Sequence, residues 1–253
     1  MRPLIKLYKS LLHAVRHWKW ETFTLPRMSS AAVDGIKLDL GFMSLGIKKI
    51  ILEGNYERAE ITICKELIGK DDIILELGSA VGFVSLFCLK HRSAKAVYCV
   101  EANPETLKIL ERNYHANGYE PNFLHGALAS SNGDVHLQVG NDFWAHSILQ
   151  PLQPPQLRDS KHEIIVPGFT FQSIWSKVPF SPNVLIVDVE GAELFIPWKE
   201  LPSEIAKVII ELHPQFIGAK ASGEIVTSLS RHGFEMFWES GAVFGFQRVS
   251  DPN

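Results

Sequence analysis

Short apolar runs alternate with helical patterns over most of the chain. From Phe83 onward, for example, apolar residues recur at helical spacing directly after the apolar run 73–77. Runs of this length, rich in Val and Ile, are typical of strands buried on both faces of a parallel sheet. The strands predicted in this way are 73–77, 96–101, 122–128, 164–166, 184–193 and 208–214, and the helices are 56–68, 105–117, 223–232 and those that begin at 83 and 170. The pattern predicts an α/β fold.

The two ends of the chain differ from this pattern. The strands 235–238 and 243–248, joined by Ser240-Gly241, are predicted to form a hairpin on the otherwise parallel sheet. Residues 33–40 are expected to form a strand or small hairpin around Asp34-Gly35. Residues 141–160, with three prolines, are predicted to form a long loop.

Residues 1–23 are basic, with near-helical spacing of their apolar positions and no acid before Glu21. The basic residues are Arg2, Lys6, Lys9, Arg16 and Lys19. A basic amphipathic helix can lie on an anionic membrane surface. The alternative, which is the more common one, is a helix that packs its apolar face on the body of the protein or on a second subunit.

Composition narrows the class of protein. Of the 253 residues, 46% are hydrophobic and 21% charged, as in ordinary soluble domains, and the net charge of -3 argues against a general nucleic-acid binder. The three cysteines form no C-x-x-C pair, so we expect free thiols in a reducing compartment. The chain has neither an apolar run of about 18 residues nor a secretory signal pattern, so a cytoplasmic location is predicted.

The loop after the first strand carries the clearest chemical signal. Gly78 to Gly82 is rich in small residues, so a ligand can approach its backbone closely. The dinucleotide pattern G-x-G-x-x-G is absent, because Ala80 and Phe83 occupy its second and third positions. The carboxylate of Glu76 would repel a phosphate but suits an ammonium group. The segment is similar to the first motif of S-adenosylmethionine-dependent methyltransferases.

Other acids follow at the ends of later strands. Glu101 ends the second strand, where an acid can accept both hydroxyls of a ribose. The fourth strand ends in three acids within the run 188–193, at the edge that faces the ligand crevice of an open α/β sheet. Crowded carboxylates there have raised pKa values or bind a cation. Asp188, Glu211 and His213 are a candidate metal site for this reason, although such a set suits Mg²⁺ or Mn²⁺ only in part.

The chain resembles the FkbM-type S-adenosylmethionine-dependent methyltransferases over residues 33–248. The segments that carry the resemblance are 54–57, 74–83, 100–104, 126–128, 188–193 and 211–214. Two positions depart from the family pattern, since Glu76 stands where Asp is common and Ile186 where Lys is common. The resemblance implies a Rossmann-like, seven-stranded methyltransferase sheet with helices on both faces. We therefore expect a methyltransferase domain at 33–253, after a helical extension at 1–32.

The family's fold also implies roles for single residues. Asp188 would lie beside the sulfonium, and the base that removes the acceptor's proton would be His213 or His146. The metal dependence is left open, and a divalent metal is not favoured. The cofactor-binding residues expected are Glu76, Gly78, Ser79, Ala80, Gly82, Glu101, Asn103, Ala127, Leu128 and Asp188.

These expectations define a function. We predict an S-adenosylmethionine-dependent O-methyltransferase that acts on a hydroxyl of a small molecule, sugar or glycan, as the resemblance implies. Nucleic acid is an unlikely partner on net charge, whereas residues 1–23 could mediate membrane binding or self-association. The alternatives are a methyltransferase with a macromolecular acceptor, RNA or protein, and a non-catalytic module that binds the cofactor.

Overall fold

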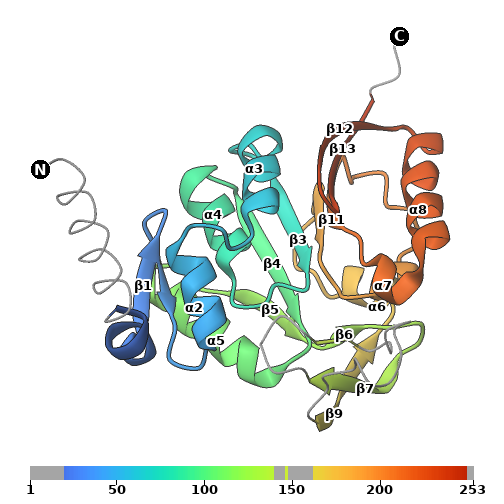
Figure 1. Ribbon diagram of the computed structural model, residues 1–253. Coiled ribbons are helices and arrows are strands. Elements are labelled where there is room, and N and C mark those ends of the chain that lie inside the picture. Colours follow the sequence, from blue (N-terminus) through green and yellow to red (C-terminus); the bar gives the residue numbers. More distant parts are fainter. Residues whose placement is uncertain (1–19, 140–145, 148–161, 250–253) are drawn as a thin grey trace, which may run out of the picture. The chain divides into compact units, whose positions relative to one another are not determined.

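The computed structural model describes residues 20–139, 146–147 and 162–249 (Figure 1). The chain forms two compact units, Met1–Tyr56 and Glu57–Asn253. Residues 1–19, which include most of the helix predicted within 1–23, lie outside the described residues. The expected boundary between residues 32 and 33 stays a prediction. None of the helices in the described part is long and apolar enough to cross a membrane.

The first unit contains the predicted hairpin and a helix that the pattern did not predict. The short helices η1 (Trp20–Thr24) and η2 (Leu25–Arg27) precede the antiparallel strands β1 (Ser30–Val33) and β2 (Ile36–Asp39). Asp34 and Gly35 connect the strands with φ angles of 49° and 71°, as a tight hairpin turn requires. The helix α2 (Leu45–Leu52) begins where the Ser44 hydroxyl accepts a hydrogen bond from the Ile47 N–H.

The second unit is built on a seven-stranded sheet of the methyltransferase type, which confirms the predicted fold. Its strand order is β12-β13-β11-β10-β3-β4-β5. The parallel strands are β3 (Ile73–Leu77), β4 (Ala96–Glu101), β5 (Asn122–His125), β10 (Val184–Val187) and β11 (Lys207–Glu211). The last two strands, β12 (Phe234–Ser240) and β13 (Val243–Arg248), form the predicted antiparallel hairpin at one edge.

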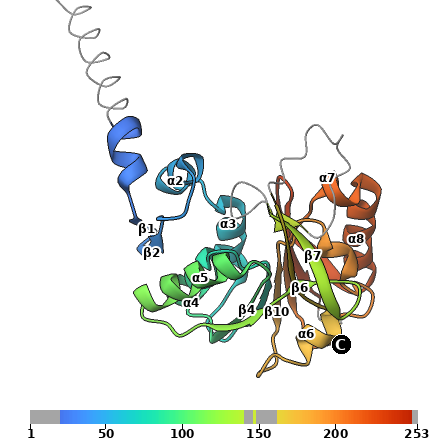
Figure 2. The ribbon, with the colours of Figure 1, turned by 90° about the horizontal axis from the view of Figure 1, so that it is seen from below.

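Helices cover both faces of this sheet (Figures 1 and 2). On one face lie α3 (Arg58–Leu67), α4 (Phe83–His91) and α5 (Pro104–Ala116), and on the other lie α6 (Phe171–Trp175) and α8 (Ala219–Arg231). The short helices η4 (Ala192–Phe195) and α7 (Pro214–Ile217) follow β10 and β11. Because both faces are covered, the central strands read as continuous apolar runs.

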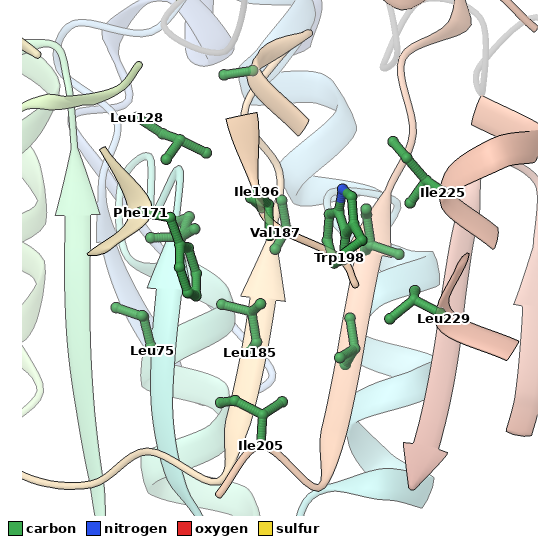
Figure 3. Close-up of a cluster of buried hydrophobic side chains, with 14 of the residues drawn as sticks. Leu75, Leu128, Phe171, Leu185, Val187, Ile196, Trp198, Ile205, Ile225 and Leu229 are labelled. Carbon is green, nitrogen blue, oxygen red and sulfur yellow. The ribbon is translucent and has the colours of Figure 1, made fainter. Parts of the chain in front are cut away.

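The face toward α6 and α8 holds a large cluster of buried hydrophobic side chains. Alternate residues of the central strands, such as Leu75, Leu185 and Val187, pack there with Phe171 of α6 and Leu229 of α8 (Figure 3). These side chains are almost completely buried. This packing holds β3 and β10 side by side, and it therefore places the segments that follow the two strands next to each other.

A second sheet, of four strands, lies in the same unit; the pattern predicts its strand at 164–166 but not the sheet that this strand joins. It contains β6 (Ala127–Leu128), β9 (His162–Phe169), β7 (Gly133–Val139) and β8 (His146–Ser147) in that order. The single strand expected at 122–128 is wrong, because the chain leaves the large sheet at Gly126. A Cβ atom on Gly126 would lie 2.5 Å from the Phe169 ring. The strand expected at 184–193 is also too long, since β10 ends at Val187.

The packing of Leu185 predicts a loss of stability when its side chain is truncated. Replacing Leu185 with Ala leaves a cavity in the middle of the sheet, so we expect a loss of about 2–5 kcal/mol in the free energy of unfolding. Leu194→Ala removes the same atoms at a position that is 46% exposed, and its effect should stay below about 1 kcal/mol. Urea unfolding followed by circular dichroism measures both, and equal losses would contradict the role given to Leu185.

Candidate active site

The carboxyl ends of β3, β4 and β10 line a pocket. These strands are parallel neighbours, so the segments that follow them meet at one edge of the sheet, where open α/β sheets bind their ligands. The four-stranded sheet adds one wall and Glu57, at the start of α3, another. The lining residues are Glu57, Leu77, Gly78, Ala80, Val100, Glu101, Ala102, Gly126, Ala127, Leu128, Leu137, Asp188, Val189, Glu190 and Ala192.

The glycine loop forms the floor of this pocket with its backbone. Gly78 has a φ of +82°, and a Cβ atom there would lie 1.6 Å from the carbonyl oxygen of Asp188. The Gly78 N–H donates to the Val100 carbonyl at 2.9 Å. The loop is thus held between the ends of β4 and β10, and α4 begins at Gly82 in the left-handed conformation. This leaves a cradle without side chains, next to a helix N-terminus.

Glu101 is fixed at the pocket wall by backbone hydrogen bonds. Its two carboxylate oxygens accept from the N–H groups of Ala80 and Asn103, at 2.9 and 2.8 Å. Burial raises the pKa of Glu101 to about 7, although these hydrogen bonds act in the opposite direction. Each carboxylate oxygen has a second lone pair, so the group can still accept hydroxyl protons from a ribose.

Glu76 lies on the other face of β3 and does not line the pocket. Its carboxylate accepts from the Cys99 thiol, with 3.6 Å between sulfur and oxygen, and Cys99 in turn contacts the Tyr114 hydroxyl at 3.2 Å. Burial raises the pKa of Glu76 to about 7, against the hydrogen bonds from Ser79 and Ser85. Its predicted role in binding the methionine part of the cofactor stays a prediction.

A cluster of carboxylates surrounds His213 beside the pocket. The imidazole Nδ1 lies 2.5 Å from Oε1 of Glu193, which is fully buried, and Nε2 lies 3.5 Å from Asp188 Oδ1 and from Glu190 Oε2. Burial lowers the pKa of His213, but the hydrogen bond with Glu193 and the charges of Glu190 and Glu211 outweigh it, so that the pKa is raised.

Two carboxyl groups of this cluster, those of Asp188 and Glu190, have raised pKa values. Burial, together with the charge of Glu211, raises the pKa of Asp188 well above its ordinary value. The pKa of Glu190 is raised by burial to about 7, and the neighbouring His213 counteracts only part of the shift. The site therefore favours a positively charged ligand, which would relieve the repulsion between these groups.

The structure brings together only some of the predicted cofactor residues. Those that line the pocket are Gly78, Ala80, Glu101, Ala127, Leu128 and Asp188, and those that do not are Glu76, Ser79, Gly82 and Asn103. His213 contacts Asp188, next to the pocket. His146 lies in β8, paired with Val139 of β7, and its side chain is outside the described residues. These roles remain predictions.

Three acids at this edge were given no individual role from the sequence, although Glu190 and Glu193 belong to the acidic run 188–193. Glu57 and Glu190 have positive φ angles of 50° and 45°, and both line the pocket. A left-handed backbone conformation is uncommon for an acidic residue, and the local sequence does not predict it here. Glu193 was included in the acidic block, yet its contact with His213 depends on how η4 and the segment after β11 fold back.

Comparison with known proteins supplies the class of enzyme. Residues 43–145 match the family described as the TRM5/TYW2 methyltransferase domain, which is less than half of the chain. The match includes β3, β4 and the glycine loop, and the pocket combines a backbone cradle, a buried carboxylate at the end of β4 and an acidic wall. The protein is an S-adenosylmethionine-dependent methyltransferase.

Solved structures with similar folds are methyltransferases of several kinds. TrmK of M. capricolum, in complex with S-adenosylhomocysteine, is 10% identical with a TM-score of 0.44, over 76% of this chain and 67% of that one. TYW2 of P. horikoshii, in complex with MeSAdo, is 13% identical with a TM-score of 0.44, over 86% and 68%. The ribosomal protein L11 methylase of Lactobacillus delbrueckii is 12% identical with a TM-score of 0.48, over 78% and 80%. No curated protein matches the chain.

The family match corrects two predictions. The family that matches is TRM5/TYW2, so the resemblance to the FkbM type was wrong. The glycine loop and the acid that ends β4, which carried the resemblance, are features that many methyltransferase families share. The small-molecule O-methyltransferase that this resemblance implied is likewise overturned, together with the expectation that nucleic acid is an unlikely partner.

The contact at Gly78 predicts a loss of cofactor binding. In Gly78→Ala the new methyl group meets the backbone of Asp188, so the loop has to move, and we expect the affinity for S-adenosylmethionine to fall at least about a hundredfold. Gly118→Ala is the matched control, because Gly118 has a φ of +81° with nothing within 4 Å of its Cβ position. Calorimetric titration with the cofactor should show an unchanged affinity for the control, and similar losses in both variants would refute the steric explanation.

The buried carboxyl of Glu76 predicts a pH dependence. Because its pKa is raised from 4.5 to about 7 in the folded state, folding retains a proton that the unfolded chain releases, and this contribution to stability is lost as the pH rises from about 4.5 through 7. Glu76→Gln stays neutral. The variant should therefore gain about 2–3 kcal/mol relative to the wild type between pH 5 and pH 8. Urea unfolding at both pH values tests this, and a difference that does not change with pH would contradict it.

Proposed function

We propose that this methyltransferase acts on RNA. The single observation that carries the proposal is the match of residues 43–145 to the TRM5/TYW2 methyltransferase domain, which points to RNA modification. The matched segment contains the glycine loop, the strands β3 to β7 and most of the residues that line the pocket.

The distribution of charge supports an RNA acceptor. Residues 1–56 contain nine Lys and Arg against four Asp and Glu, although the whole chain has a net charge of -3. Most of this excess lies in residues 1–19, which contain five basic side chains and no acid. Contacts with phosphates supply much of the affinity for nucleic acids, and a local basic segment suffices for them.

The roles of single residues follow from the pocket. We assign the two ribose hydroxyls of the cofactor to Glu101, and its methionine part to the backbone from Gly78 to Ala80. Ala127 and Leu128 lie where the adenine ring would pack. Asp188 and Glu190 face the region of the sulfonium. The bound cofactor supplies a methyl group on a positively charged sulfur, and these two carboxylates would stabilise that charge.

Transfer of labelled methyl groups tests the proposal. The full-length protein is incubated with tritiated S-adenosylmethionine and either a mixture of tRNA transcripts or a mixture of sugars and other small hydroxyl compounds. We expect label in the RNA, at a rate that falls with added salt because the RNA contacts are ionic. Label found only in the small compounds would overturn the proposal.

A charge-neutralised variant sharpens this test. Changing Lys6, Lys9 and Arg16 to Ala should weaken RNA binding at least about tenfold and flatten its salt dependence, because phosphate contacts are lost. In the matched control, Lys70, Lys90 and Lys95 are changed to Ala. These residues lie near the amino ends of β3 and β4, at the edge of the sheet opposite the pocket. Filter binding with a tRNA transcript compares the two, and equal losses would count against the basic segment.

A further inference from the structure

Asp188, Glu211 and His213 converge beside the pocket from the ends of two adjacent strands. Each offers one ligand atom, and these atoms all lie within 4.8 Å of one another. Asp188 follows β10 directly, Glu211 ends β11, and the register pairs Val187 with Ile210. The sheet itself therefore holds the three side chains together, as a rigid ligand site requires.

The orientation of His213 matches that of a metal-bound histidine. Its Nδ1 is engaged by the buried carboxylate of Glu193 at 2.5 Å, so Nε2 faces the cluster. Metal-ligating histidines usually give their second ring nitrogen to a carboxylate or carbonyl, which fixes the ring. Glu193 holds that position here and lies outside the ligand set itself.

The distance at Nε2 fits a shared ion better than a hydrogen bond. Nε2 lies 3.5 Å from Asp188 Oδ1, the ligand atom that the neighbouring strand provides. Hydrogen bonds between nitrogen and oxygen are typically about 2.7–3.2 Å long. Two ligands that are each about 2.1 Å from one tetrahedral ion lie about 3.4 Å apart.

One buried oxygen and one imidazole nitrogen in the cluster point to a missing partner. Asp188 Oδ1 is inaccessible to solvent and has no hydrogen-bond partner among the described residues. His213 is only 4% exposed, and within the same part of the chain its Nε2 makes no hydrogen bond, while it faces Asp188. A buried charged oxygen without a partner is costly, and a cation would remove the cost.

We propose that Asp188, Glu211 and His213 bind a divalent first-row transition ion, such as Zn²⁺, beside the cofactor pocket. Imidazole ligands favour ions of this class, whereas Ca²⁺ and Mg²⁺ prefer oxygen ligands alone. Three protein ligands leave a coordination position open toward the pocket. The Nε2 lone pair then serves the ion, so His213 is a ligand in place of the predicted base.

Cobalt titration of the full-length protein tests the site. Co²⁺ replaces Zn²⁺ in tetrahedral sites and absorbs visible light there, so chelator-treated protein should show one saturable absorbing site that Zn²⁺ displaces. His213→Ala and Glu211→Gln should each weaken this binding at least tenfold. Glu193→Gln should weaken it about tenfold or more, through the orientation of the ring.

The matched control is another histidine next to a carboxylate. His136, at an exposed position of β7, contacts Glu163 of β9. His136→Ala should leave Co²⁺ binding unchanged. The absence of a saturable Co²⁺ site would overturn the proposal. Unchanged Co²⁺ binding in Glu211→Gln would also overturn it, and this variant alone decides the test if His213→Ala does not fold. The titration uses neither cofactor nor RNA, so its failure is distinct from a failure of the proposed RNA activity.

Discussion

The backbone of the glycine loop lies directly against the backbone at the end of β10, and the site depends on this contact. No side chain fits at Gly78, where a Cβ atom would lie 1.6 Å from the Asp188 carbonyl oxygen. Hydrogen bonds from Gly78 to Val100 and from Asp188 to Leu77 join the ends of β3, β4 and β10. The acids that follow these strands therefore converge on one pocket, because their backbones are held in register.

The cost of this arrangement is electrostatic. Burial raises the pKa of Glu101 and Glu190 to about 7, and that of Asp188 well above its ordinary value. One imidazole contacts three carboxylates and carries at most one positive charge. A sulfonium cofactor with an ammonium group, and a divalent ion next to it, would both offset this repulsion. The features that are unfavourable in the protein alone are thus those that select its positively charged ligands.

The methyl acceptor could not be predicted from the motifs of the cofactor site. The glycine loop and the acid at the end of β4 are features that many methyltransferase families share. They carried the resemblance to the FkbM type, and the family match to the TRM5/TYW2 domain overturned it. The net charge gave the wrong prediction about nucleic acid for a different reason. The value of -3 averages a basic segment at residues 1–19 with an acidic remainder, and nucleic acids respond to the local field.

Local pattern was sufficient for the elements whose signals are local. The strands β3 and β4, the start of α4 at Phe83 and the hairpin turn at Asp34-Gly35 all lie where the sequence predicts them. Apolar runs, glycine positions and turn residues determine these elements over a few neighbouring positions. The same signals predicted the α/β class and the cofactor, because a strand, a small-residue loop and a helix follow one another without interruption.

Only the tertiary structure decided what depends on contacts distant in sequence. The chain leaves the large sheet at Gly126, where the Phe169 ring leaves no room for a side chain. Glu76 faces Cys99 and does not line the pocket. The pairing of Glu193 with His213 likewise arises where η4 meets the end of β11. A sequence pattern records which residues alternate, but the face that each one occupies is set by the packing of helices on both sides of the sheet.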